Sequence, residues 1–214
     1  VVPRSRGGPD HPRNIVLACV PCNGSKSNKL PSEWCATVPA NVAEIEAAVC
    51  AKVAVSLANR RGRKPRTGKL VCWFQGRMEW GPRALGNRSL LADPRRAEIR
   101  DIINLKVKQR EPFRPFAPSV LEEKSYSYFG NPIPSPFMLF AFKVNPNRQK
   151  EIPAVTHVDG TARPQTVSKE TNWLYWNLIK EFENRTGVPV LLNTSFNVQE
   201  PIVCSPKDAV TCFL

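Results

Sequence analysis

Short apolar runs, separated by polar and glycine-rich segments, dominate the chain from residue 68 onward. Three of these runs have the length of a single β-strand and lie at residues 69–74, 137–144 and 188–192. The run at 137–144 is apolar at nearly every position. We therefore expect it to be a buried strand.

Three stretches between and after these runs carry the signals of helix ends. Asp93 followed by Pro94 predicts a helix start, because Asp caps helices and Pro fits the first helical position. Thr171 predicts the cap of a second helix, which ends at Gly187. Ser205-Pro206-Lys207-Asp208 predicts a capping box that opens a last helix. Strands that alternate with helices predict an α/β domain.

The chain divides into three parts on this pattern. Residues 1–36 are polar and turn-rich, residues 37–67 hold an expected helix and a basic linker, and residues 68–214 form the α/β domain. The run at residues 60–66 combines Gly, Pro and like charges, which cannot build a core, so it marks the domain boundary. It is interpreted as a solvated linker, with nucleic-acid contact as the alternative.

The density of charged residues differs between the N-terminal part of the chain and the remainder. The net charge of +13 predicts an anionic partner, either nucleic acid or a phosphorylated small molecule. Residues 1–70 hold 12 basic and 4 acidic residues, a density typical of a nucleic-acid binder or a solvated linker. The remainder holds 19 basic and 14 acidic residues, so an anion site there needs a few well-placed cations.

The compartment and the completeness of the chain are also expectations. No apolar run approaches the roughly 20 residues that span a bilayer, so no membrane partner is expected. The chain has seven Cys, an odd number, and no secretory leader, which favours a reducing cytoplasm. The first residues already belong to the middle of a motif, so we expect a fragment.

The loop at residues 76–89 is too polar and too rich in Gly and Arg for core packing. Its glycines allow the backbone to approach a ligand, and Arg77, Arg83 and Arg88 supply planar forks for phosphate oxygens. A glycine-rich loop alone is a weak signal. Three arginines in twelve residues make it a moderate one for a phosphate site.

A second cationic segment covers residues 106–116. Lys108 follows the predicted helix, where a cation could merely complement the helix dipole. Arg114 lies between Pro112-Phe113 and Pro115-Phe116, a rigid apolar frame. We expect the side chain to point into a cleft, the alternative being stacking on an aromatic ring.

The third polar region combines two loops. His157 and Arg163 lie in one, and a histidine of this kind is more often structural than a catalytic base. Asn193 and Ser195 follow an apolar strand, and ligands bind open α/β sheets beyond the carboxyl ends of strands. Their amide and hydroxyl suit a planar urea-like or carboxylate group.

These motifs together carry a resemblance. Residues 68–214 resemble the C-terminal domain of the nodulation-type and tobramycin-type O-carbamoyltransferases. Four ordered motifs carry it: Gln75–Ser89, Arg110–Pro118, His157–Arg163 and Asn193–Asn197. The resemblance implies a YrdC-like fold, a twisted mixed sheet with helices and a basic concave face.

The resemblance also implies chemistry. In such domains ATP and carbamoyl phosphate give carbamoyl-adenylate, with Mg²⁺ on the phosphates. Carried over by position, four residues are expected to be the catalytic phosphate and nucleotide cations: Arg83, Lys108, Arg114 and Arg163. Five more are expected to bind substrate or nucleotide: Arg77, Arg88, His157, Asn193 and Ser195.

Complete members of that family place a Kae1-like domain first. It carries a metal, expected to be Fe²⁺, and transfers the carbamoyl group to a hydroxyl. No such sequence is found in this chain. We therefore expect a carbamoyltransferase domain that carries out the adenylating half-reaction, with a Kae1-like domain as partner in a longer protein.

The first 36 residues resemble the back half of an HNH-endonuclease motif, a small ββα and zinc-knuckle-like segment. Asn14 and Asn23 match the second and third motif residues, whereas the catalytic His is missing and His11 does not replace it. Cys19 and Cys22 have the spacing of half a zinc site, the alternative being a reduced pair without metal. No nuclease activity is expected.

Two functions from other classes remain open at this point. The chain could be a nucleic-acid-binding remnant of an HNH endonuclease, binding through residues 1–66 and carrying an inactive C-terminal domain. A YrdC-like domain could also bind RNA, as relatives in tRNA modification do. Four ordered motifs outweigh half of one, so the adenylating enzyme is the preferred interpretation.

Overall fold

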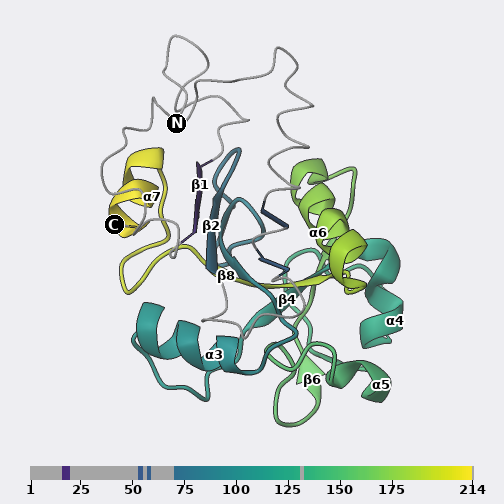
Figure 1. The fold of residues 1–214 in the computed structure, drawn as a ribbon. Coiled ribbons are helices and arrows are strands. Elements are labelled where there is room, and N and C mark those ends of the chain that lie inside the picture. Colours follow the sequence, from purple (N-terminus) through teal and green to yellow (C-terminus); the bar gives the residue numbers. More distant parts are fainter. Residues whose placement is uncertain (1–15, 20–52, 55–56, 59–69, 131–132, 214) are drawn as a thin grey trace.

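The computed structural model describes the backbone of residues 16–19 and the whole of residues 53–54, 57–58, 70–130 and 133–213. Figure 1 shows a twisted sheet at the centre with helices on both sides of it. The described part is a mixed α/β domain, which confirms the fold class predicted from the sequence.

The main sheet has six strands among the described residues. They are Val16–Cys19 (β1), Leu70–Phe74 (β2), Arg88–Ala92 (β3), Ala117–Leu121 (β4), Gln165–Val167 (β7) and Val190–Ser195 (β8). Their order across the sheet is β1-β2-β3-β8-β4-β7, and only β4 and β7 run parallel. Strand β8 therefore lies between β3 and β4, with Asn193 opposite Leu91 on one side and Ala117 on the other.

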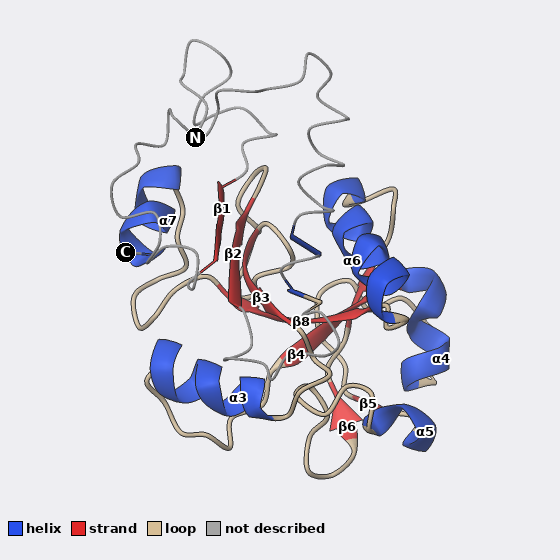
Figure 2. Ribbon diagram, in the orientation of Figure 1, coloured by secondary structure: helices blue, strands red, loops and turns tan. Residues whose placement is uncertain are grey.

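Helices cover both faces of this sheet, and a small hairpin extends from it. The helices are Glu98–Ile102 (α3), Ser125–Phe129 (α4), Pro146–Gln149 (α5), Trp173–Thr186 (α6) and Pro206–Phe213 (α7). Helix α3 continues as a π-helical turn, Ile103–Val107. Strands Phe142–Lys143 (β5) and Thr161–Ala162 (β6) form the hairpin. Figure 2 shows α6 and α4 on one side of the sheet and α3 and α7 on the other.

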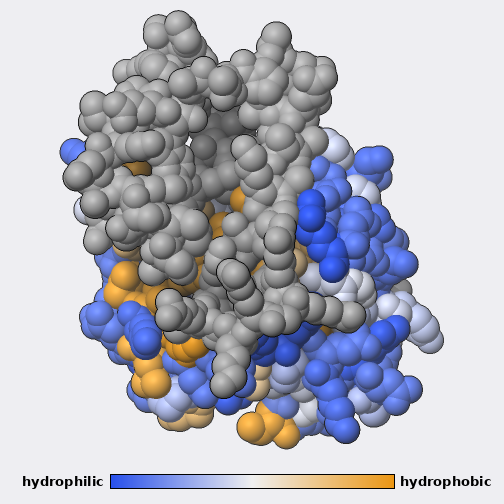
Figure 3. Space-filling view, in the orientation of Figure 1, coloured by the Kyte–Doolittle hydropathy of each residue, from blue (hydrophilic) through white to orange (hydrophobic). Residues whose placement is uncertain are grey.

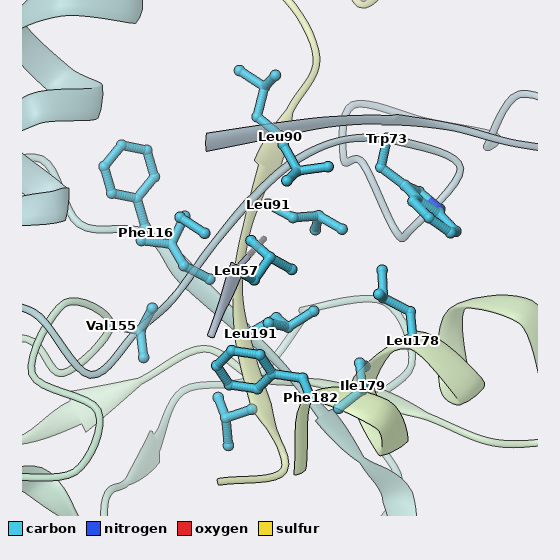
Figure 4. Packing of buried hydrophobic residues seen from close by; sticks show 14 of the residues in the cluster. Leu57, Trp73, Leu90, Leu91, Phe116, Val155, Leu178, Ile179, Phe182 and Leu191 are labelled. Atoms are coloured by element: carbon cyan, nitrogen blue, oxygen red, sulfur yellow. The ribbon is translucent and has the colours of Figure 1, made fainter. Parts of the chain in front are cut away.

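The core lies between α6 and the sheet. Leu174, Tyr175, Leu178, Ile179 and Phe182 recur at helical spacing, and all five are buried. Figure 4 shows Leu178, Ile179 and Phe182 of this helix facing the leucines of β3 and β8, with Leu57 in the middle of the cluster. This packing fixes α6 against β8, and the loops at the sheet edge rest on that unit.

One strand prediction is wrong. Within residues 137–144 only Phe142–Lys143 forms a strand. Phe137 is 59% exposed and Leu139 is 70% exposed. Met138 has a φ of 55°, a left-handed conformation that a strand does not accommodate. The prolines that precede this run, Pro134 and Pro136, also lack the N–H that a ladder requires.

Two predicted helix starts are also wrong, and one is confirmed. Asp93 caps no helix, because its carboxylate binds Arg95 in a bidentate ion pair, and α3 begins at Glu98. Asn172, not Thr171, caps α6, since its Oδ1 accepts from the backbone N–H of Tyr175. The capping box before α7 is confirmed by reciprocal hydrogen bonds between Ser205 and Asp208.

Most of the N-terminal predictions lie outside the described residues, including the basic linker and nearly all of the HNH-like segment. Of that segment only the backbone of β1 is described, and it pairs with β2. On the face shown in Figure 3, hydrophilic residues cover the side formed by α4 and α6. None of the described helices has the length and apolar character needed to cross a lipid bilayer.

Candidate functional site

The glycine-rich loop, residues 76–87, joins β2 to β3 and is folded around one carboxylate. Oε1 of Glu79 accepts hydrogen bonds from the backbone N–H groups of Leu85, Asn87 and Arg88. Asn87 also donates its side-chain amide to the carbonyl of Arg77, at 2.7 Å. A carboxylate that collects several backbone N–H groups fixes their direction, so the loop has a defined shape.

Buried side chains from three strands support the loop from below. Asn193 of β8 donates to the carbonyl of Ala84 at 3.1 Å, and Gln165 of β7 donates to the carbonyl of Leu85 at 2.7 Å. Ser119 of β4 joins the two amides, because its hydroxyl donates to Gln165 and accepts from Asn193. This network replaces the water that the two loop carbonyls would otherwise bind.

Gly86 allows the loop to approach this support. Its φ is +105°, and a Cβ added there would lie 2.2 Å from Cδ1 of Tyr175. Tyr175 is fully buried in α6, so its ring cannot move away. Only glycine satisfies both the backbone conformation and the space.

Arg83 projects from the supported part of the loop and is exposed. It lies near Arg163, which follows β6: burial lowers the pKa of Arg163, and the charge of Arg83 lowers it further. Nε of Arg163 is buried and has no hydrogen-bond acceptor. Neither arginine has a carboxylate partner in the described part of the chain.

Two such cations without a counter-charge would attract an anion. Like unit charges about 6 Å apart repel by about 3 kcal/mol at an effective dielectric of 20. A phosphoryl group between them would replace this repulsion with two attractions. The planar guanidinium groups also match the geometry of phosphate oxygens.

Arg88 is placed differently from the other arginines of the loop. Only 4% of its surface is exposed, and its guanidinium lies 3.5 Å from the centre of the Phe74 ring. Its nitrogens donate to the carbonyls of Gln75, Gly76, Asn87 and Cys204. In this arrangement Arg88 joins the loop to the segment before α7, and its donors face protein carbonyls.

Arg77, the remaining arginine of the loop, is exposed. Its side chain has no partner among the residues that the structure describes. It is therefore available to an anion but is not held in one position.

Lys108 is buried at the end of the π-helical turn and is only 5% exposed. Its Nζ donates to the carbonyl oxygens of Ser195 and Asn197, at 2.7 and 2.8 Å, and to Oδ1 of Asn197 at 2.7 Å. Burial, together with the nearby charge of Arg110, lowers the pKa of Lys108 to about 8. The amine thus ties the end of β8 to the end of α3, with the hydroxyl of Ser195 at 3.3 Å.

Arg114 lies in a loop that Asn104 holds. The buried amide of Asn104 donates to the carbonyls of Pro112 and Arg114. The Arg114 side chain itself is 51% exposed and forms an ion pair with Glu111 at 2.8 Å. Phe113, expected to frame it, is 79% exposed. The side chain therefore lies at the surface, where an anion would compete with Glu111.

His157 lies on the wall of an open pocket of about 270 Å³. Phe113 and Pro115 also line this pocket, so residues of the second and third motifs of the sequence meet here. Burial lowers the pKa of His157; the Asp159 carboxylate opposes this, and the Arg163 guanidinium adds to it. Nδ1 of His157 lies 3.3 Å from the hydroxyl of Thr161, so the ring is held within its own loop.

The structure therefore divides the predicted site residues into two groups. Arg163 lies close enough to Arg83 and to His157 for their charges to interact, and these three residues form the first group. Lys108 and Ser195 form the second group, at the end of β8. Asn193 is 1% exposed and belongs to the support beneath the loop, where its Oδ1 has no partner.

Glu79 and Gln165 were missed by reasoning from the sequence. Glu79 could have been found as the one acidic residue among three arginines in the loop. Gln165 gave no comparable signal, because its role depends on contacts with residues 80 positions away.

The predicted zinc half-site is not described. Cys22 lies outside the described residues, and for Cys19 only the backbone is described. Elsewhere, the described residues contain no cluster of three or more His, Cys, Asp or Glu side chains that could hold a metal ion.

Comparison with known protein families identifies the family of this chain. Residues 64–214 match the family model described as Carbamoyltransferase C-terminus, which is more than half of the chain. The chain belongs to the carbamoyltransferase C-terminus family. Residues 1–29 match the model of the HNH endonuclease family, so that segment is similar to part of an HNH endonuclease.

Curated relatives support the same membership for this carbamoyltransferase C-terminal domain. Nodulation protein NolNO of Sinorhizobium fredii is 55% identical over 162 residues, which are 74% of this chain and 24% of the relative. Nodulation protein NolO of Bradyrhizobium diazoefficiens is 56% identical over 151 residues, 69% of this chain and 28% of the relative. The chain thus spans about a quarter of the length of these relatives.

Proposed function

We propose that this carbamoyltransferase domain binds ATP and carbamoyl phosphate and forms carbamoyl-adenylate. The carbamoyl group would then be transferred to a hydroxyl acceptor by a Kae1-like domain, with its own Fe²⁺, in a longer protein. Membership of the family supports the carbamoyl chemistry. The adjacent Arg83 and Arg163, which lack a carboxylate partner among the described residues, are the observation that supports a polyphosphate ligand.

The reaction proposed for this site moves phosphoryl groups and needs no covalent enzyme intermediate. Water releases inorganic phosphate from carbamoyl phosphate and leaves carbamate. A carbamate oxygen then forms a bond to the α-phosphorus of ATP, and the bond to pyrophosphate breaks. Negative charge on the phosphoryl oxygens is stabilised by Arg83 and Arg163 if they hold one phosphoryl group of ATP between them, and by Arg114 at the rim.

Mg²⁺ enters this proposal as part of the Mg-ATP substrate. The described residues contain no group of three or more His, Cys, Asp or Glu side chains that could hold a metal ion. The ion would therefore be held by the phosphates and would offset their charge. The protein's own contribution is the set of arginines.

Calorimetric titration of Mg-ATP at physiological salt, with and without carbamoyl phosphate, tests the proposal. Arg163→Ala should weaken ATP binding at least tenfold, about 1.4 kcal/mol. Because Nε of Arg163 has no acceptor, its removal should leave stability almost unchanged. Binding should be followed by pyrophosphate release that depends on carbamoyl phosphate.

Arg185→Ala is the matched control. Arg185 lies on α6, is 38% exposed and has Glu181 at 3.8 Å, and its removal changes the net charge by the same amount. It should alter ATP affinity less than twofold. Equal weakening in both variants would show that the loss of affinity comes from the change in net charge. A folded wild type that binds no ATP would contradict the proposal.

A second candidate function concerns the N-terminal part. The match of residues 1–29 to the HNH family and the basic residues of the linker favour nucleic-acid contact through residues 1–66. Arg60→Gln combined with Arg61→Gln should then weaken RNA or DNA binding and reduce its salt dependence. Unchanged affinity and salt dependence, measured by fluorescence anisotropy, would exclude this region as the contact.

A further inference from the structure

Gln165, which lies outside the family motifs, connects several parts of the site. It opens β7 and is 5% exposed. Its Nε2 donates to the carbonyl of Leu85 at 2.7 Å. Its Oε1 accepts from the hydroxyl of Ser119 at 2.7 Å and from the amide of Asn193 at 3.1 Å. One side chain thus joins β7, β4 and β8 to the loop.

The position of this hydrogen bond relates it to the two cations. Leu85 follows Arg83 by two residues, and Gln165 follows Arg163 by two residues. The bond between Gln165 and Leu85 therefore links the two segments that carry the arginines, although 80 positions separate its partners. Asn193 also holds the loop, at Ala84, but it belongs to neither cation-bearing segment.

The two arginines would not stay together without such a link. Each charge repels the other, and neither arginine forms an ion pair with a carboxylate in the described part of the chain. Arg83 is exposed and stands on a loop, so repulsion could move it into solvent. A buried hydrogen bond at a fixed distance from each arginine opposes that movement and preorganises the pair for one anion.

We propose that Gln165 is a positioning residue that holds Arg83 beside Arg163, so that both guanidinium groups address one phosphoryl group. The ligand in this inference rests on the proposed function, whereas the role of Gln165 in holding the loop does not. Loss of the Gln165 amide should free the loop while leaving both arginines present. The consequence is weaker anion binding without loss of any group that touches the anion.

The test compares Gln165→Met with Thr166→Val in the whole chain. Thr166 is the next residue of β7, is 2% exposed, and its hydroxyl accepts from the backbone N–H of Ser135 at 2.9 Å. Thr166→Val removes one buried side-chain hydrogen bond from this strand and Gln165→Met removes three, but only the loss of Gln165 releases Leu85. Hydrogen exchange of the peptide covering residues 83–86 should accelerate at least tenfold in Gln165→Met and remain unchanged in Thr166→Val.

Affinity for Mg-ATP provides the second readout. Gln165→Met should weaken binding at least tenfold, and Thr166→Val less than twofold. In an Arg163→Ala background the same Gln165 substitution should have an effect below twofold, because no pair is left to align. Where Gln165→Met does not fold, Gln165→Asn, whose amide is one methylene too short, should show the same pattern.

The outcomes separate this inference from the proposed function. Equal exchange or equal affinity loss in Gln165→Met and Thr166→Val would overturn the positioning role, as would full additivity with Arg163→Ala. A wild type that binds no Mg-ATP would overturn the proposed function. The exchange experiment would then still decide whether Gln165 holds the loop.

Discussion

At the scale of single residues, the site depends on groups that face inward as much as on those that face solvent. Arg88 and Lys108 were predicted from the sequence as ligands of phosphate, and the structure places both in contact with protein oxygens. The identity of a cation can be read from the sequence. Its partners cannot, because the carbonyls around Arg88 come from segments as distant as Cys204.

Gly86 offers a prediction with an internal control. Gly86→Ala should lower the free energy of unfolding by about 3–4 kcal/mol, because the new Cβ would meet the Tyr175 ring and the positive φ adds strain. Gly81→Ala should cost only about 1–2 kcal/mol, since Gly81 has a φ of +100° but open space around it. Urea denaturation of both variants measures the difference, and equal losses would rule out the clash.

Lys108 offers a prediction on pH. Its pKa is about 8 in the folded protein and about 10.5 in the unfolded chain, so the unfolded chain binds more protons between these values. The contribution of Lys108 to stability therefore increases as pH rises from 8 to 10.5, by up to about 3 kcal/mol. Below pH 8 the amine is charged in both states and its penalty is constant.

The measurement compares wild type with Lys108→Met by urea denaturation at pH 7.5 and 9.5. Other groups titrate in this window and oppose the trend, because burial raises the pKa of the Cys212 thiol to about 12. Only the difference between the two proteins isolates Lys108. A difference that does not change with pH would show that the amine stays charged throughout.

At the scale of elements, the cap of α6 connects the core to the loop. Asn172 accepts from the backbone of Tyr175, and its amide group also exchanges hydrogen bonds with Gln75 and Asn87. The same residue thus begins the helix and holds the base of the glycine-rich loop. Propensity did not settle the choice between Thr171 and Asn172, because Thr and Asn are both good caps and the tertiary contacts distinguish them.

This arrangement predicts unequal effects at adjacent positions. Asn172→Ala should destabilise the protein by about 2–3 kcal/mol, since a cap is lost and buried partners are left without it. Thr171→Ala should change stability by less than about 0.5 kcal/mol, because Thr171 is exposed and its hydroxyl shares an exposed hydrogen bond with that of Ser168. Thermal unfolding of both variants measures the two losses of stability. A larger loss in Thr171→Ala than in Asn172→Ala would identify Thr171 as the cap.

At the scale of the whole molecule, the sequence predicts the class of fold better than the arrangement of its elements. Apolar runs located β2 and β8, and residues of the second and third motifs line one pocket. The order of strands was not accessible, because the insertion of β8 between β3 and β4 depends on contacts far apart in sequence. The segment around Leu139 was predicted to be buried because it is hydrophobic, but it is exposed. Hydrophobicity alone does not reveal the backbone conformation that places these side chains at the surface.

The central place of β8 has a consequence for how the protein is made. Strand β8 lies between β3 and β4, so the edges of β3 and β4 that face it stay unpaired until β8 has been synthesised. The 68 residues between Leu121 and Val190 take roughly 3–14 s at ribosomal rates of about 5–20 residues per second. During that time two apolar strands present open edges to other nascent chains. A translational pause or a truncation before residue 190 should therefore yield aggregates or a chaperone-bound chain, whatever the stability of the finished domain.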